Sequence, residues 1–330
     1  MKDHITRPAE EVLRSKNWLP EGVDVTGTDI AGAGNMNLVE RIQLDNGTSL
    51  ILKRARGWVE KYPDIPAPIE RAEVEAAFYA SVAGTDAGRA MPAHLGFDAA
   101  ESANLFEDLG ESRDGMFVYA GETLPLDQLE AVADWAAALH SIPVTDAMRS
   151  RFGNEAMRTL NALHIFDFPL DPDNQFALDD ITPGLQAAAD ALKQDAKFKA
   201  AARRVATRYQ SRASGAGDVL LHGDLYPGSW LATDRGLFVI DPEFCWIGPA
   251  EWDLGVLTAH LRLSRQPADY GSLLLARYGQ PVDHALLNTI TGIEIMRRLI
   301  GVAQLPLDLD LAEKKALLDE AHALVTGTCP

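Results

Sequence analysis

A change in hydrophobic periodicity near Gly110 constrains the fold of this chain more than any other feature of the sequence. Before it, short aliphatic and β-branched runs alternate with turn residues, and Asn46-Gly47 is a strong signal for a tight hairpin. After it, apolar residues recur at the 3.6-residue spacing of amphipathic helices. The chain is therefore predicted to be an α+β protein, with a small N-terminal lobe at residues 1–110 and a larger, mainly helical lobe at 111–330.

The same patterns place the individual elements. In the first lobe we expect an antiparallel sheet with a helix packed on it, from strands beginning near Val25 and at 38–44, 49–53, 94–97 and 104–106, and a helix at 69–82. In the second lobe we expect helices at 127–140, 185–212, 252–263, 270–278, 284–299 and 311–325. One apolar segment of different character, 219–243, lies between these helices.

Charge and composition exclude several classes of protein. The chain has 330 residues, with 30 basic and 48 acidic side chains and a formal net charge of −18, so a nucleic-acid binder or a binder of anionic membranes is not expected. Cys245 and Cys329 provide neither a disulfide framework nor a zinc-binding spacing, and they fit a reducing compartment. The start of the chain has no apolar signal region, and no apolar run is long enough to span a membrane. A cytoplasmic protein is expected.

The strongest chemical signal lies in 220–243. Asp224 follows an apolar run and precedes a Pro-Gly turn, and seventeen residues later Asp241 and Glu243 end a second apolar run. If these runs are two strands joined by the short connection at 233–236, their ends meet and bring three carboxylates together. Such a cluster needs a cation, and oxygen ligands alone favour Mg²⁺ over zinc. The alternative is that these acids are turn residues at strand ends.

This arrangement suits phosphoryl transfer, in which one carboxylate accepts the proton of an attacking hydroxyl and others hold Mg²⁺ against nucleotide phosphates. The sequence His222-Gly-Asp-Leu-Tyr-Pro-Gly-Ser229 resembles the catalytic loop of the aminoglycoside phosphotransferase and choline kinase superfamily. Asp241-Pro-Glu-Phe, followed by Gly-Pro and Trp252-Asp-Leu-Gly, is similar to the 5-methylthioribose kinase branch in particular. The resemblance implies a protein-kinase-like bilobal fold and ATP with Mg²⁺ as cofactors.

The resemblance also implies roles for these residues. Asp224 would be the catalytic base, Asp241 the principal metal ligand and Glu243 an assisting one. Ser229 stands where many superfamily members carry Asn as a second metal ligand. Asp253 is expected to hold the catalytic loop through backbone hydrogen bonds.

The first lobe carries residues that fit a nucleotide site. Gly32, Gly34 and Asn35 lie in a turn that resembles the nucleotide-binding loop of methylthioribose kinases, because glycines let backbone N–H groups approach phosphates. Lys53 ends the third strand, where a lysine neutralises phosphates in kinases. Glu75 on the following helix resembles its usual partner, with Glu73 as a competing choice. Glu107 lies in a segment that resembles the lobe-connecting hinge, whose backbone would bind adenine.

Arg297 and Arg298, in Glu294-Ile-Met-Arg-Arg, resemble the twin arginines that face the acceptor site of methylthioribose kinases. Guanidinium groups could bind ribose hydroxyls or the transferring phosphoryl group, and the alternative is a buried ion pair with an acid. Two departures concern the acceptor: Tyr226 replaces the usual His, and 57–68 matches poorly.

The sequence therefore predicts a small-molecule kinase that phosphorylates a hydroxyl, with 5-methylthioribose or a related sugar as the first candidate acceptor. An amino alcohol or an aminoglycoside is the second candidate. A nucleotide-binding pseudokinase with a regulatory role is the alternative from another class. A homodimer is left open.

Overall fold

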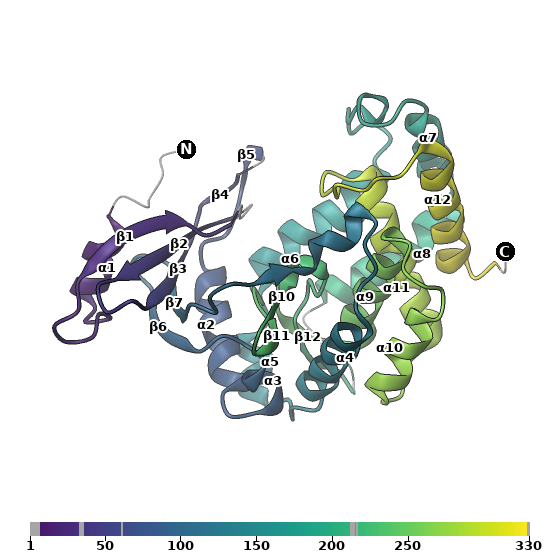
Figure 1. The fold of residues 1–330 in the computed structure, drawn as a ribbon. Helices are drawn as coiled ribbons and strands as arrows, with labels where there is room; N and C mark the ends of the chain where they lie inside the picture. Colours follow the sequence, from purple (N-terminus) through teal and green to yellow (C-terminus); the bar gives the residue numbers. More distant parts are fainter. Residues whose placement is uncertain (1–6, 33–35, 61, 212–214, 216, 329–330) are drawn as a thin grey trace.

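The computed structural model describes residues 7–32, 36–60, 62–211, 215 and 217–328, and it has two lobes that lie side by side (Figure 1). The strands are β1 (Val25–Ile30), β2 (Asn37–Leu44), β3 (Ser49–Ala55), β4 (Trp58–Val59), β5 (Tyr62–Pro66), β6 (His94–Asp98), β7 (Ala103–Glu107), β8 (Arg113–Asp114), β9 (Val219–Leu221), β10 (Trp230–Thr233), β11 (Gly236–Val239) and β12 (Trp246–Gly248). The α-helices are α1 (Ala9–Ser15), α2 (Arg71–Val82), α3 (Asp86–Arg89), α4 (Leu126–His140), α5 (Asp146–Arg151), α6 (Glu155–Ala162), α7 (Leu185–Gln194), α8 (Ala196–Gln210), α9 (Glu251–Leu263), α10 (Tyr270–Tyr278), α11 (His284–Ile300) and α12 (Leu311–Thr326).

The first lobe is built on a five-stranded antiparallel sheet in the order β1-β2-β3-β7-β6. The β2–β3 hairpin turns at the predicted Asn46-Gly47, where the Asn46 side chain accepts hydrogen bonds from the Thr48 backbone N–H and hydroxyl. The α1 helix packs on the outer part of this sheet through Leu13, against Ile42 and Leu52. The register places Lys53 of β3 opposite Asn104 of β7, in the middle of the sheet.

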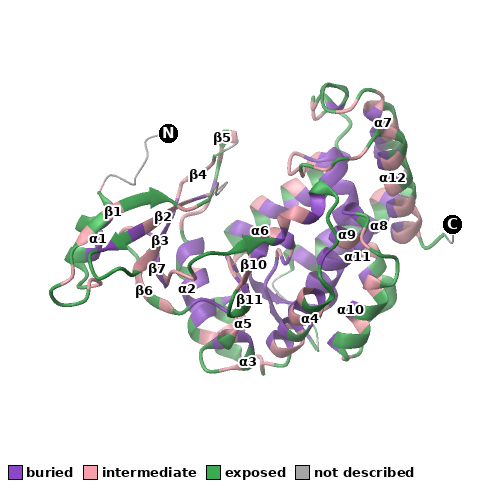
Figure 2. Ribbon diagram, in the orientation of Figure 1, coloured by how far each residue is buried: buried purple, intermediate pink, exposed green. Residues whose placement is uncertain are grey.

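The second lobe is organised around α11, which packs against α9 and against α12. Nearly all side chains of α9 are buried, and the second half of α11 is buried throughout (Figure 2). Because α11 is enclosed on all sides there, charged residues in that half must pair with one another. No helix in the described part of the chain is long and apolar enough to cross a membrane.

The fold class is the predicted one, an α+β bilobal fold, and the bounds of α4, α9, α10, α11 and α12 differ by at most a few residues from those expected. The helix expected at 185–212 is instead two helices. Asp195 separates α7 from α8 and caps α8, since its side chain accepts a hydrogen bond from the Phe198 N–H. An aspartate that serves as an N-cap in this way interrupts a run whose apolar spacing continues through it.

The pairing expected within 219–243 is also wrong. β11 pairs with β10, and β10 also pairs with β8, whereas β9 pairs with β12. The strand that precedes Asp224 is therefore not part of the hairpin that precedes Asp241. Several elements were not expected from the sequence. They include the β4–β5 hairpin, α1, α5, α6 and the π-helix at Leu163–Asp167.

Candidate active site

Lys53 lies at the centre of the contacts between the two lobes. Its Nζ donates to Glu75 Oε1 of α2 at 2.8 Å and also to Asp241 Oδ1, which belongs to the second lobe. The Glu243 carboxylate lies 4.0 Å from the same Nζ. The structure thus selects Glu75 as the partner of Lys53, while Glu73, the competing choice, lies near Arg151 instead.

The charges around Lys53 determine its protonation state. Burial opposes the ammonium charge, but the carboxylates of Asp241, Glu75 and Glu243 outweigh it and raise the pKa of Lys53. Burial raises the pKa of Glu75 to about 7, while Lys53 works in the opposite direction. For Asp241, the cost of partial burial is likewise outweighed by Lys53, and the pKa of this carboxyl is lowered. Lys53 and Asp241 are therefore an ion pair at neutral pH.

Glu243 is fixed by residues that the sequence analysis did not select. Arg71 Nε donates to Glu243 Oε2 at 3.0 Å, and Asn37 Nδ2 donates to the same oxygen at 2.9 Å. The Arg71 guanidinium also donates to backbone carbonyls of Met36, Arg56 and Pro68. Arg71 is one turn before Glu75 on α2, a spacing that places both on one face of the helix. This spacing was the only sequence signal that could have identified it.

The acidic residues of this cluster fit a divalent cation. Oxygen atoms of Glu75, Asp241 and Glu243 lie within 4.8 Å of one another, and the Asp241 side chain is 45% exposed. Asp241 has φ of +66°, a strained conformation for a residue other than glycine that is found preferentially at functional sites. Carboxylate oxygens are the ligands that Mg²⁺ prefers. Ser229, the other predicted ligand, donates its hydroxyl to the Asp224 carbonyl at 2.7 Å.

A buried aspartate holds the loop that carries Asp224. Asp253 of α9 accepts from the backbone N–H groups of His222 and Gly223 at 2.8 and 2.9 Å, which confirms the expected role of Asp253. Gly223 has φ of +90°, and a Cβ at this position would lie 2.1 Å from the Phe244 carbonyl oxygen. Only glycine fits there, because the loop approaches the following segment so closely.

Asp224 faces the two arginines of α11. Arg297 Nη2 lies 3.1 Å and Arg298 Nη2 lies 3.3 Å from Asp224 Oδ1. Both arginines also donate through Nε to Glu294, to Oε2 from Arg297 and to Oε1 from Arg298 at 2.7 Å. The two interpretations of the arginine pair are therefore compatible: the side chains form a buried ion pair with Glu294, and their outer ends face Asp224.

The other residues predicted for the site are Gly32, Gly34, Asn35 and Glu107. Gly32 follows β1 with φ of +90°, and Gly34 and Asn35 lie outside the described residues. Glu107 ends β7, where its carboxylate accepts from the Ala93 N–H at 3.1 Å and its backbone pairs with Leu50. The chain passes from β7 to β8 just beyond Glu107, so this residue lies at the transition between the lobes.

Comparison with known families agrees with this geometry. The sequence profile of the phosphotransferase enzyme family matches residues 30–288, a span that contains Lys53, Asp224 and Asp241. The chain belongs to this family. The superfamily resemblance noted from the catalytic loop is thereby confirmed.

Curated relatives extend the comparison. A methylthioribose kinase of Exiguobacterium sibiricum is 31% identical over 260 residues, covering 76% of this chain and 64% of the relative. A methylthioribose kinase of a Geobacillus species is 25% identical over 347 residues, covering 90% of this chain and 82% of the relative. The first match thus spans less than two thirds of the length of the Exiguobacterium protein.

Solved structures show that the fold is shared. A choline kinase from Streptococcus pneumoniae superimposes with a TM-score of 0.55 at 13% identity, covering 96% of this chain and 99% of its own. A spectinomycin phosphotransferase in complex with ADP and spectinomycin has a TM-score of 0.56 at 13% identity. The match covers 100% of this chain and 95% of the phosphotransferase. The bilobal, kinase-like architecture expected from the resemblance is therefore correct.

Proposed function

We propose that this protein is an ATP- and Mg²⁺-dependent kinase that phosphorylates a hydroxyl group of a small molecule, with 5-methylthioribose or a related sugar as the acceptor. The observation that carries the proposal is the placement of the Asp224 carboxylate against Arg297 and Arg298 in a chain that also joins Lys53 to Asp241. These are the two parts a kinase needs, one for the acceptor and one for the phosphates.

In the proposed mechanism each cluster performs one task. Lys53 binds phosphate oxygens, and its ion pair with Glu75 keeps the ammonium group in place. Asp241 and Glu243 would hold Mg²⁺, with Glu75 beside them, and the metal would supply positive charge against the transferring phosphoryl group. The Ser229 hydroxyl instead donates to the Asp224 carbonyl. Asp224 orients the acceptor hydroxyl and accepts its proton as the oxygen bonds to the γ-phosphorus of ATP and the bond from that phosphorus to ADP breaks, which releases ADP.

The geometry around Asp224 supports this role. Both arginines approach Oδ1, and among the described residues no hydrogen bond to Oδ2 is present. Oδ2 can therefore accept a hydrogen bond from an acceptor hydroxyl. The guanidinium groups are donors only, so they complement hydroxyl oxygens and the developing charge of the phosphoryl group.

The acceptor proposal is supported by the relatives together with the arginines. The curated relatives described above are methylthioribose kinases. Two guanidinium groups beside the base repel an ammonium group, so a neutral polyol fits the site better than a cationic amino alcohol or aminoglycoside. This argument uses charges that lie within contact distance of Asp224.

ATP-to-ADP turnover tests the proposal. Purified protein with Mg²⁺ is assayed against 5-methylthioribose, ribose, choline, homoserine and kanamycin, with Asp224→Ala as the control. We expect acceptor-dependent turnover with 5-methylthioribose that the control abolishes. Turnover with another acceptor alone would refute the acceptor but keep the kinase. Equal, slow turnover of both proteins with every acceptor would refute the kinase itself.

A further inference from the structure

Glu294 connects the arginine pair to a chain of buried polar residues that the proposed mechanism does not use. Its Oε1 accepts from Arg298 and lies 3.1 Å from His260 Nε2 of α9. The other ring nitrogen of His260, Nδ1, lies 2.5 Å from the Tyr119 hydroxyl. The chain therefore runs from Tyr119 through His260 and Glu294 to the arginines and ends at Asp224.

Exposure decreases along this chain from the site into the lobe. The Asp224 side chain is 21% exposed, whereas Arg297, Arg298, Glu294 and His260 are 6%, 8%, 4% and 1% exposed. An acceptor molecule can therefore reach Asp224 and the outer ends of the arginines, but it cannot reach Glu294 or His260. Any influence of these two residues on the reaction must act through the arginines.

The hydrogen bonds fix the direction of each donor. Burial lowers the pKa of His260 to about 4, so the ring is neutral at pH 7 and has one N–H. The two arginines outweigh burial at Glu294 and lower its pKa, so Glu294 is a carboxylate that can only accept. His260 therefore donates from Nε2 to Glu294, and Nδ1 accepts from the Tyr119 hydroxyl.

A guanidinium held only at its outer end can rotate about its long side chain, whereas one held at Nε as well is fixed in a plane. Glu294 binds both Nε atoms, one with each carboxylate oxygen. The ring of Tyr226 adds a contact, because the Arg298 guanidinium lies 5.1 Å from its centroid. Tyr226 also packs against His260, with ring centroids 5.4 Å apart.

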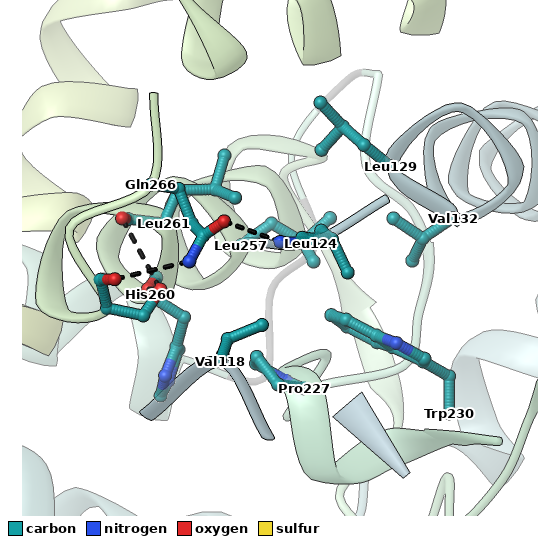
Figure 3. Close-up of a pocket in the computed structure, with 11 residues that line it drawn as sticks. Val118, Leu124, Leu129, Val132, Pro227, Trp230, Leu257, His260, Leu261 and Gln266 are labelled. Carbon is teal, nitrogen blue, oxygen red and sulfur yellow. Dashed lines mark hydrogen bonds between the residues drawn. The ribbon is translucent and has the colours of Figure 1, made fainter. Parts of the chain in front are cut away.

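The cavity that borders His260 is too small for an acceptor molecule. A cavity of about 10 Å³, the volume of roughly one water molecule, is bordered by His260, Pro227 and Trp230 (Figure 3). Its lining is mostly apolar, and the His260 ring points away from it towards Tyr119 and Glu294. The buried residues are thus explained by what they hold and not by a molecule that binds beside them.

We propose that Glu294, supported by His260 and Tyr119, is the positioning residue that holds Arg297 and Arg298 in the orientation the acceptor reaction requires. This inference rests on the proposed function, in that the reaction it affects is phosphoryl transfer to an acceptor at Asp224. Glu294 does not touch the acceptor. It acts by fixing where the two guanidinium groups point.

The first test is the kinetics of Glu294→Gln with ATP and 5-methylthioribose. The amide has the same shape but lacks the charge, so the arginines lose their common anchor. We expect kcat to fall on the order of 10²-fold, because a small displacement of positioning groups has this effect, while KM for ATP stays unchanged. Glu294→Asp, which keeps the charge on a shorter side chain, should recover part of kcat. Tyr119→Phe removes the end of the chain and should lower kcat about fivefold or less.

Thr291→Val is the matched control. Thr291 is buried on α11, one turn before Glu294, and its hydroxyl donates to the Gly255 carbonyl at 3.4 Å without contacting the arginines. This variant should keep the wild-type kcat and KM. If Glu294→Gln and Thr291→Val alter kinetics equally, the role of Glu294 is only structural and the proposal is wrong.

A second measurement does not depend on turnover. Arginine side-chain NMR of the full chain should include slowly exchanging Nε–H signals of Arg297 and Arg298, which Arg297→Lys and Arg298→Lys identify by their loss. Both signals should lose their protection in Glu294→Gln and keep it in Thr291→Val. If they stay protected in Glu294→Gln, the positioning role is overturned even for a protein that phosphorylates none of the acceptors. If the wild-type protein phosphorylates none of the acceptors but Glu294→Gln still loses the protection of both Nε–H signals, the positioning role holds and only the proposed acceptor reaction is wrong.

Discussion

The two charged clusters of this protein differ in where their residues come from and in their charge. The cluster around Lys53 joins β3 and α2 of the first lobe to the segment after β11 in the second, and it contains two cations and three carboxylates. The cluster around Asp224 lies within the second lobe and contains two cations and two carboxylates. Counted with every carboxylate ionised, the first has a formal excess of one negative charge and the second is balanced.

This difference separates the two tasks of a kinase. A cluster with excess negative charge attracts a cation, and one assembled from both lobes depends on how the lobes are held together. The second cluster combines the loop residue Asp224 with three residues of α11 in a fixed geometry, and its two guanidinium groups disfavour a cationic acceptor. We therefore expect changes in the first cluster to affect nucleotide use, and changes in the second to affect the acceptor step.

The largest effect is expected for Asp224→Asn. The amide keeps the shape of the side chain but cannot accept the proton of the acceptor, so kcat should fall about 10²–10⁴-fold. ATP binding should stay unchanged, because the nucleotide contacts belong to the other cluster. Isothermal titration with ATP alongside turnover separates the two quantities. A comparable loss of ATP affinity would show that the clusters are not independent.

Arg71→Lys tests the cluster between the lobes. Lysine keeps the charge but cannot reach Glu243 and the carbonyls of Met36, Arg56 and Pro68 together, so kcat/KM for ATP should fall on the order of 10²-fold. KM for the acceptor should remain unchanged.

Arg54→Lys is the matched control for this substitution. Arg54 is a buried arginine that follows Lys53 on β3, so its side chain lies on the opposite face of the sheet, where it pairs with Glu40. Equal losses of kcat/KM in Arg54→Lys and Arg71→Lys would mean that Arg71 serves only the stability of the lobe.

Local sequence patterns predicted most of the elements, because apolar spacing and turn residues act over short distances. They failed where tertiary contacts decide the outcome. The apolar spacing of 185–212 continues through Asp195, yet its side chain caps a new helix there. The pairing of β9 with β12 joins strands separated by the whole β10–β11 hairpin, a choice that no local signal contains.

The candidate site was likewise predictable where residues stand in local motifs and not where tertiary contacts decide. Lys53, Asp224 and Asp241 stand in recognisable motifs, and the structure brings Lys53 and Asp241 into contact across 188 residues. Arg71 and Asn37 stand in no such motif, and their importance arises only because Glu243 folds against them. Glu294 stands within the arginine motif, but its contact with His260 arises only because α9 packs against α11.

The smallest effect we predict is on stability, and it comes from His260, which contacts Glu294 of the second cluster. Because burial lowers the pKa of His260 to about 4, the unfolded chain binds more protons than the folded one between pH 6.5 and 4. The contribution of His260 is complete above pH 6.5 and is lost as the pH falls towards 4. At pH 5 this loss is about 2 kcal/mol of the free energy of unfolding.

Urea unfolding of wild type, His260→Gln and His284→Gln at pH 7 and pH 5 measures this loss. His284 is exposed at the start of α11, so His284→Gln should keep the wild-type pH dependence. His260→Gln should have a smaller difference between the two pH values, because glutamine does not titrate. If the free energy of unfolding of His260→Gln differs between pH 7 and pH 5 as much as that of wild type, another group causes the acid sensitivity. His94 and His164 are the next candidates, since burial lowers the pKa of both and gives the same sign.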